Sequence, residues 1–464
     1  MIATLAASGL IAAFMQTVVT PIIPELPQLL DTTRADASWV LTATLLAAAI
    51  STPISGRLGD MYGKRRIMLV LLIIMTAGSV VAALSFSLIP MVVGRVLQGI
   101  GLGVIALGIS ILRDVIHPKN LGGAVALVSA TLGVGGALGL PLAATIAQFL
   151  DWHFLFWLAA ALSIGAVVAV ASVIPVSTLR SGGHFDLVGA LGLAVGLVGI
   201  LLAVSKGTEW GWTSPLTLGL LGGGLLVLIL WGWFELRTTN PLVDLRVALR
   251  RTVLLTNLAS ITVGAAFFVC TASLPIVLES PPGSGVGLGL ALIPASLCLM
   301  PLGLVMFFLS PVAARLSASR GPRVSLILGG IVITVGFTLA IFFLDQVWHV
   351  ILVSTITGIG VGFAYAAMPT LIMRAVPPSE TAAANGLNSV MRTLGSTIAA
   401  TVVGIILSTH VVVTEGIGVP TREAFALVFV LGAGVVLAGV VLALFIPRRF
   451  ANYSTSSIPV QNPS

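Results

Sequence analysis

The chain has 464 residues, of which 58% are hydrophobic and only 8% are charged. A soluble globular domain carries roughly 25% charged residues, so this composition excludes a water-soluble fold and predicts an all-α, polytopic membrane protein. The net charge of +7 is confined to short connections and does not predict a nucleic-acid partner. The two cysteines, Cys270 and Cys298, lie in apolar stretches and predict neither a disulfide framework nor a metal site.

Fourteen stretches are apolar and long enough to cross a bilayer, which takes about 20 residues per helix. The N-terminus has no basic leader, so the first stretch is expected to be retained. The apolar run 67–112 is divided at Ser85-Phe86-Ser87 and Pro90, because it is too long for one crossing. The expected spans are 3–24, 38–57, 67–86, 90–112, 121–149, 154–176, 187–205, 215–235, 253–278, 288–313, 323–344, 348–373, 381–409 and 423–446.

Positive charge alternates between successive connections. With the N-terminus placed inside, nearly every Lys and Arg outside the spans falls on the inner side, and only Arg34, Lys206 and Arg422 fall outside. Cytoplasmic loops of membrane proteins are enriched in Lys and Arg. We therefore expect a multi-pass protein of the cell (inner or plasma) membrane, surrounded by the lipid bilayer, with both termini in the cytoplasm.

The chain repeats itself. Arg57-Leu58, Gly63 and Arg65 recur 258 residues later as Arg315-Leu316, Gly321 and Arg323. Secondary transporters are often built from repeated halves around a central site. We predict a six-helix half at 1–179, two inserted helices with a cytoplasmic loop at 180–251, a second six-helix half at 252–450, and a disordered cytoplasmic tail at 451–464.

Residues 56–66 read as a charged, glycine-punctuated turn between the second and third spans. Their pattern, Gly-x-Leu-x-Asp-x-x-Gly-x-Arg-Arg, resembles the signature of the major facilitator superfamily of secondary transporters. The resemblance implies the major facilitator fold, with a latch that holds one arrangement of the two halves. Basic residues alone would also fit an ordinary positive-inside loop. The latch candidates are Gly56, Asp60, Gly63, Lys64, Arg65 and Arg66.

Arg95 and Gln98 in the fourth span form the core of the pattern Arg-x-x-Gln-Gly-x-Gly, which resembles a second motif of the same superfamily. An arginine at the bilayer centre costs roughly 2.5–3.5 kcal/mol on insertion scales and usually marks a pathway. The two residues are three apart and share one helical face. We expect them to line a substrate or proton pathway; the alternative is an arginine that snorkels to the interface.

Polar residues also mark one face of the thirteenth span. Asn385, Asn388 and Arg392 are spaced by three and four residues, which places them together on a helix. Such a stripe either lines a cavity or holds another helix. The run around them resembles the fourteen-helix drug:proton antiporter family, DHA2, and implies a place for these residues on the substrate or proton pathway.

The fifth span is rich in small residues and contains a proline. Gly135, Gly139 and Pro141 resemble the helix-bending motif of exporters in this superfamily. The motif departs from its usual form, because Leu140 separates Gly139 from Pro141 and Ala143-Ala144 replaces a glycine pair.

The first span lacks an expected acidic residue. Thr17-Val18-Val19-Thr20-Pro21 resembles the first helix of the family, and many members carry an aspartate two residues before that Thr, where Met15 stands. No Asp or Glu falls in the middle of a span. Glu25, at the outer end of the first span, and Glu279, after the ninth, are the nearest candidates. Either Glu25 serves as the proton carrier, or coupling uses another group, or is not to protons in the usual way.

The resemblance implies a transporter rather than an enzyme, without a cofactor and acting as a monomer. Its substrates would be small hydrophobic or amphipathic compounds, exported in exchange for protons as in multidrug efflux and antibiotic resistance. Gly222-Gly223-Gly224 lacks the Gly-Lys-Ser/Thr ending of a P-loop, so ATP hydrolysis is not expected. Two alternatives are a dedicated exporter of one native lipid or metabolite, and a non-transporting membrane sensor or scaffold.

Overall fold

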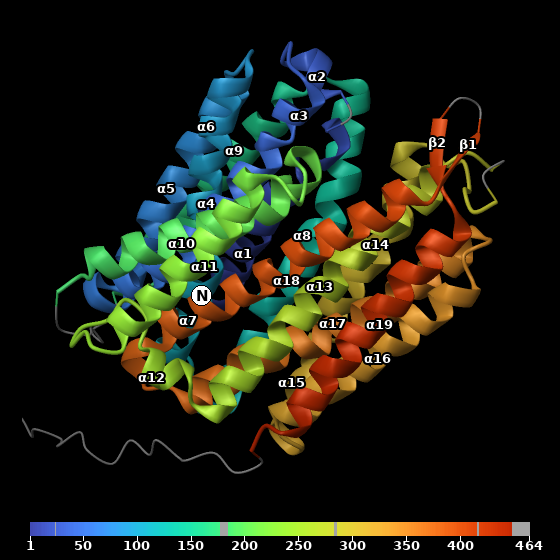
Figure 1. Cartoon of the computed structure of the whole chain (residues 1–464). Helices are drawn as coiled ribbons and strands as arrows, with labels where there is room; N and C mark the ends of the chain where they lie inside the picture. Colours follow the sequence, from blue (N-terminus) through green and yellow to red (C-terminus); the bar gives the residue numbers. More distant parts are fainter. Residues whose placement is uncertain (24, 177–183, 283–284, 415–416, 448–464) are drawn as a thin grey trace, which may run out of the picture.

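A computed structural model describes the chain except for residues 24, 177–183, 283–284, 415–416 and 448–464 (Figure 1). The described part contains fourteen helical segments that are long and apolar enough to cross a membrane. The prediction of an all-α, polytopic membrane fold with fourteen spans is therefore confirmed. The predicted tail at 451–464 and the predicted boundary at 179–180 lie outside the described residues.

The first group of helices runs from the N-terminus to residue 173. Buried apolar residues of these helices form one hydrophobic core. The fourth span consists of two helices, which are interrupted at Leu102-Gly103. The elements are α1 (Ile2–Thr17), η1 (Thr20–Ile22), α2 (Leu26–Leu29), α3 (Arg34–Ala37), α4 (Trp39–Tyr62), α5 (Lys64–Ala83), α6 (Leu88–Gly101), α7 (Val104–Val115), α8 (Pro118–Phe149) and α9 (His153–Val173).

Two further helices, α10 (Leu187–Trp210) and α11 (Pro215–Glu235), pack against each other, and α10 also contacts α4 and α18. A connection that contains α12 (Leu245–Ala248) leads to the second group, which has its own hydrophobic core. This group consists of α13 (Arg251–Glu279), α14 (Leu292–Phe308), α15 (Ser310–Ser319), α16 (Pro322–Phe342), α17 (Val347–Ala375), η3 (Pro378–Glu380), α18 (Thr381–Thr409) and α19 (Arg422–Leu444).

A short antiparallel hairpin, β1 (Val411–Thr414) and β2 (Ile417–Pro420), joins α18 to α19. The sequence prediction had placed no strand there. The run Val411-Val412-Val413 is β-branched, which favours an extended conformation once the helix has ended at Thr409. The hairpin does not change the fold class.

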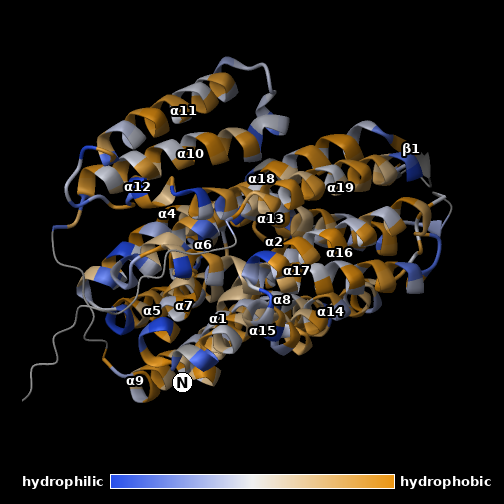
Figure 2. Cartoon of the chain, turned by 90° about the horizontal axis from the view of Figure 1, so that it is seen from below, coloured by the Kyte–Doolittle hydropathy of each residue, from blue (hydrophilic) through white to orange (hydrophobic). Residues whose placement is uncertain are grey.

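The long helices consist mainly of hydrophobic residues, while hydrophilic residues are concentrated at helix ends and in the connections (Figure 2). On α11 most positions are exposed although the helix is almost entirely apolar, which suits a helix that faces lipid. We call the end of the bundle that carries Lys64, Arg113 and α12 the basic end. The opposite end, which carries α2, α3 and the hairpin, is the far end (Figure 1).

The internal repeat of the sequence is also a repeat of contacts. The Cα of Gly99 packs on the carbonyl group of Thr44, and the Cα of Gly358 packs in the same way on the carbonyl group of Leu302. Residues 44 and 302 are separated by the same 258 positions as the sequence repeat. The correspondence places α4 and α14 in equivalent positions, as it does α6 and α17.

Glycine allows the two groups to touch at mid-membrane. α8 and α14 cross where Gly303 contacts the backbone of Gly133, and a Cβ at Gly303 would overlap the carbonyl oxygen of Gly133. Small residues are the usual means of close helix approach in membranes.

We predict that Gly303→Val lowers the thermal stability of the purified protein, because overpacking of this kind costs about 1–3 kcal/mol. Gly434→Val is the matched control, since a Cβ at Gly434 meets nothing within 4 Å. Unfolding in detergent can be followed by tryptophan fluorescence. Equal unfolding temperatures for the two variants would contradict the close crossing.

Candidate functional site

The signature stretch at 56–66 is helical, and the prediction of a turn across it was wrong in extent. α4 continues to Tyr62 and α5 begins at Lys64, so Gly63 alone makes the reversal. Gly63 has φ 104° and ψ 123°, a conformation that a side chain would strain. Its repeat partner Gly321 has φ 90°. The sharp corner positions Asp60 and Lys64 on adjoining helix ends.

Asp60 reaches from the first group to the second. Its side chain is fully buried, and Oδ2 accepts a hydrogen bond at 3.2 Å from the backbone N–H of Ala383, in the first turn of α18. A carboxylate at a helix N-terminus is stabilised by the unpaired N–H groups and by the helix dipole. Gly56 brings the two helices together, because a Cβ there would lie 2.6 Å from the carbonyl oxygen of Ala382.

Two residues that the sequence prediction did not include complete this contact. Asp114 binds Lys64 Nζ through both carboxylate oxygens at 2.9 Å, while Asp60 Oδ1 lies 3.7 Å from the same Nζ. Arg113 donates to Thr381 Oγ1 at 2.5 Å and to the carbonyl oxygen of Val376 at 3.1 Å. In the sequence, the adjacent charged residues Arg113 and Asp114 at the end of a span were the feature that could have predicted this contact.

Arg65 and Arg66, also predicted latch residues, lie elsewhere. Arg65 donates at 2.5 Å to the carbonyl oxygen of Ala171 near the end of α9, within the first group. Its repeat partner Arg323 bonds the carbonyl oxygen of Ala443 at 3.2 Å near the end of α19. These arginines bind the last turn of a helix in each group, and Arg66 is exposed.

Arg95 and Gln98 are fully buried, so in this conformation they do not face the open pathway that the sequence suggested. Arg95 Nη1 donates to the Met15 carbonyl oxygen at 2.9 Å and to Gln98 Oε1 at 2.6 Å, and Nε donates to the Val40 carbonyl oxygen at 3.2 Å. Gln98 Nε2 donates to Ser79 Oγ at 2.9 Å. The network ties α1, α4, α5 and α6 together.

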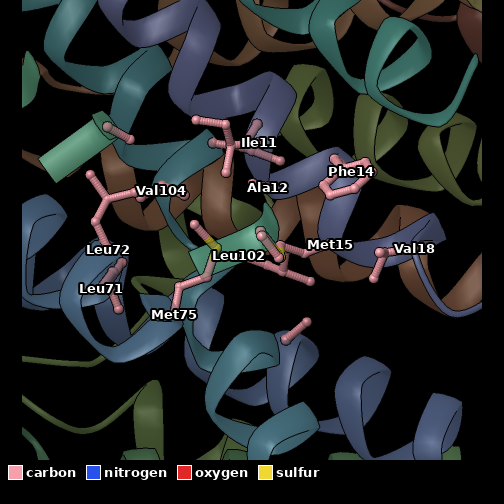
Figure 3. Close-up of a cluster of buried hydrophobic side chains, with 14 of the residues drawn as sticks. Ile11, Ala12, Phe14, Met15, Val18, Leu71, Leu72, Met75, Leu102 and Val104 are labelled. Atoms are coloured by element: carbon pink, nitrogen blue, oxygen red, sulfur yellow. The ribbon is translucent and has the colours of Figure 1, made fainter. Parts of the chain in front are cut away.

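Met15, where an aspartate was expected, belongs to a cluster of buried hydrophobic side chains (Figure 3). Its sulfur accepts a weak hydrogen bond from Ser79 Oγ at 3.8 Å. The positive charge of Arg95 is thus met by carbonyl oxygens around Met15, and no ion pair of Arg95 occurs among the described residues. Glu25 is exposed, at the start of α2 on the far end.

The polar face of α18 forms a second network, within the second group. Asn388 Nδ2 donates to Asn257 Oδ1 at 3.0 Å and to Ser260 Oγ at 2.6 Å, both on α13. Arg392 donates to Asn388 Oδ1 at 2.9 Å, and its guanidinium lies 5.1 Å from the centre of the Tyr365 ring. Arg392 is partly exposed, whereas Asn388 and Tyr365 are buried.

Asn385, the third polar residue of that face, lies one turn closer to the basic end. Its Nδ2 donates to the Thr381 carbonyl oxygen at 2.9 Å, while its Oδ1 is buried without a hydrogen bond. It adjoins the Asp60 contact rather than Arg392. The predicted stripe is therefore divided between two places.

The small-residue motif of α8 packs on α1. A Cβ at Gly135 would lie 2.7 Å from the Leu10 carbonyl oxygen, and one at Gly139 would lie 2.5 Å from Thr17 Oγ1. The helix continues through Pro141 without interruption, and Thr145 Oγ1 donates to the Pro141 carbonyl oxygen at 2.7 Å.

Comparison with known proteins agrees with this geometry. The family model described as Major Facilitator Superfamily matches residues 5–400 and 288–460. The chain belongs to the Major Facilitator Superfamily. Its members are transporters rather than enzymes, as predicted.

Relatives within the superfamily include resistance proteins. The chain is 26% identical to the lincomycin resistance protein LmrB of Listeria monocytogenes, over 96% of both proteins. It is 26% identical to the multidrug resistance protein Stp of Mycobacterium tuberculosis, over 86% of this chain and 74% of Stp. These similarities agree with the predicted resemblance to the DHA2 family.

Two further matches differ from these in how much of each chain they cover. An uncharacterized MFS-type transporter of Mycobacterium tuberculosis (strain H37Rv) is 28% identical over 59% of this chain, but the match spans only 40% of that protein. The crystal structure of the human organic anion transporter MFSD10 superimposes with a TM-score of 0.66 over 95% of this chain and 98% of MFSD10, at 15% identity. The second match confirms the major facilitator fold.

We predict that Asp60→Asn loosens the basic end of this superfamily member. A carboxylate at a helix N-terminus is worth about 1 kcal/mol, so its loss should speed opening about five-fold. The readout is maleimide labelling of Thr52→Cys, a buried position of α4, with Cys270 and Cys298 replaced by Ala. Asp151→Asn, an exposed carboxylate at the far end, is the control. Equal labelling in Asp60→Asn and the parent would contradict the latch.

Proposed function

We propose that the chain exports hydrophobic or amphipathic compounds by alternating access and that protons drive this export. The observation that carries the proposal is the set of polar contacts from Asp60 and Arg113 to residues 376–383, since they join the two groups directly at the basic end. Polar contacts can be exchanged for water when that end opens. The similarity to LmrB and Stp, which are named for lincomycin and multidrug resistance, supports export as the direction.

The proposal includes an orientation. The basic end would face the cytoplasm of the cell, because Lys and Arg favour cytoplasmic loops. The far end would face outward, with both termini inside and the protein acting as a monomer. Under this arrangement the closed basic end corresponds to a conformation that is shut toward the cytoplasm.

The orientation predicts opposite labelling of two exposed positions. With Cys270 and Cys298 replaced, Glu423→Cys at the far end should react with a membrane-impermeant maleimide in intact cells. Arg320→Cys at the basic end should react only after the cells are permeabilised. The reverse pattern would contradict the orientation.

The half-buried Arg392 face is the best-supported place for a substrate. Arg392 and Asn388 supply polar groups, and the rings of Tyr365 and Phe267, whose centres lie 6.1 Å apart, supply an apolar surface beside them. A few polar groups in a largely apolar setting suit amphipathic compounds. The Arg95 network would instead stiffen the first group, with its positive charge close to any proton pathway.

Transport in proteoliposomes tests the function. We predict that an imposed proton gradient drives lincomycin and ethidium across the membrane in the direction opposite to proton flow. An ionophore that collapses this gradient should stop this transport, and protein-free liposomes are the control. Flux that ignores the gradient would overturn proton coupling. Flux of neither compound would favour the dedicated exporter or the non-transporting protein.

Arg392→Ala should lower the flux about ten-fold, because hydrogen bonds to a charged group are worth about 1.5–3 kcal/mol. Arg315→Ala, an exposed arginine at the basic end, is the matched control and should leave the flux unchanged. If Arg392→Ala transports like Arg315→Ala, the polar face of α18 is structural only.

A further inference from the structure

Two carboxyl groups face each other at the basic end of the inserted helices. Asp186 caps the N-terminus of α10, where Oδ1 accepts a hydrogen bond from the backbone N–H of Gly189 at 2.7 Å. Glu235 is the last residue of α11 and is only 2% exposed. A Cβ at Gly189 would lie 2.5 Å from Asp186 Oδ2 and 2.6 Å from Glu235 Oε1, so both oxygens border the same space over Gly189.

No cation neutralises this pair among the described residues. Both Glu235 oxygens and Asp186 Oδ2 are buried without a hydrogen-bond partner, and neither residue forms an ion pair in the described part of the chain. Two cations that follow Glu235 in the described part of the chain are engaged elsewhere. Arg237 lies over the Trp233 ring at 3.9 Å, and Arg246 donates to the Leu236 carbonyl oxygen at 2.7 Å.

The other neighbours of Glu235 are N–H groups rather than charges. The indole of Trp231 and the backbone N–H groups of Leu242 and Val243 face its carboxyl group. His184 is exposed at the start of the segment that leads to α10. These groups can support one negative charge, but two carboxylates in one buried space repel each other strongly.

We propose that Asp186 and Glu235 form a proton-binding site, in which one proton is shared between the two carboxyl groups. The proton removes one of the two charges and provides the donor that a pair of carboxylates lacks. Asp186 retains its cap on α10 through Oδ1. The site is separate from Arg95, Arg392 and the substrate face, and it does not depend on the chain being an exporter.

The position of the site connects it to the contact between the two groups. We call residues 236–250, between α11 and α13, the strap. Leu242 and Val243 of the strap are buried in one hydrophobic cluster with Leu387 of α18 and Ala49 of α4. Loss of the shared proton would place a second charge beneath this part of the strap and loosen it from α18.

The strap has room to move. A pocket of about 220 Å³ separates part of it from the first turns of α18. Asn240 and Asp244 line the strap side of the pocket, while Glu380 and Ala383 line the α18 side. Arg57, 8% exposed and with Nε unpaired, closes the pocket from α4. Ala383 is the residue whose N–H binds Asp60, so the strap and the latch meet at one helix turn.

Infrared difference spectroscopy of the full chain in liposomes tests the proton site directly. A carboxylic acid has a C=O stretching band that a carboxylate lacks, and isolated Asp and Glu lose it near pH 4, their pKa values being about 3.9 and 4.3. We expect the wild type to keep such a band near neutral pH. Glu235→Gln should remove the part of the band that the shared proton contributes, whereas a contribution from Asp60, which is also a buried carboxyl group, should stay.

Asp186→Asn gives a second, independent result. Glu235 would then be buried without a like charge beside it, so its band should remain but disappear at a lower pH than in the wild type. Glu209→Gln, at the other end of α10 and paired with Lys206 at 2.8 Å, is the control and should change nothing. Absence of the band in the wild type near neutral pH, or a band of unchanged intensity in Glu235→Gln, would overturn the proposal.

The link to the strap has its own readout. The readout is the rate of maleimide labelling of Asn240→Cys in a chain without Cys270 and Cys298. Labelling of Glu423→Cys reports the ordinary increase in thiolate as the pH rises. The labelling rate of Asn240→Cys should increase several-fold more than that of Glu423→Cys. Glu235→Gln should remove this excess, because glutamine stays neutral. An excess that is the same in both backgrounds would show that the strap does not respond to the shared proton.

Discussion

The carboxylate of Asp60 lies at the N-terminus of α18, and the basic end is arranged around this contact. Gly56 allows the two backbones to approach, Lys64 is held in place by Asp114, and Arg113 binds the residues just before α18. Asp60 and Lys64 are buried and Arg113 is partly buried, so in the closed state these groups satisfy one another and the contact forms as a unit. The crossing of Gly133 and Gly303 at mid-membrane is apolar by contrast, and it can persist while the basic end opens.

Much of the fold could be predicted from the sequence because a bilayer imposes length, apolarity and charge sidedness on each span. The repeat could also be predicted, since Gly63 and Gly321 must make the same left-handed corner. The partners of the site residues could not. Arg65 bonds a carbonyl group on α9, and Arg113 bonds Thr381, 268 positions away, and no local pattern encodes such tertiary contacts.

The acidic residues illustrate the same limit in physical terms. No Asp or Glu lies in the middle of a predicted span. At the position where the family resemblance predicts an aspartate, Met15 packs as an ordinary core residue. Asp186 and Glu235 lie at helix ends, where carboxylates are expected to be solvated, and only the packing of α10 on α11 buries them together above Gly189. Burial without a counter-charge, rather than position in the span, is what distinguishes them.

Alternating access through the Asp60 contact is the central claim, and electron-spin distance measurements test it most directly. Spin labels at Arg66→Cys and Arg320→Cys report the basic end, and labels at Phe86→Cys and Glu423→Cys report the far end. All four positions are exposed. Introducing Asp60→Asn should lengthen the first distance and shorten the second. Unchanged distances, or both ends lengthening together, would contradict the account.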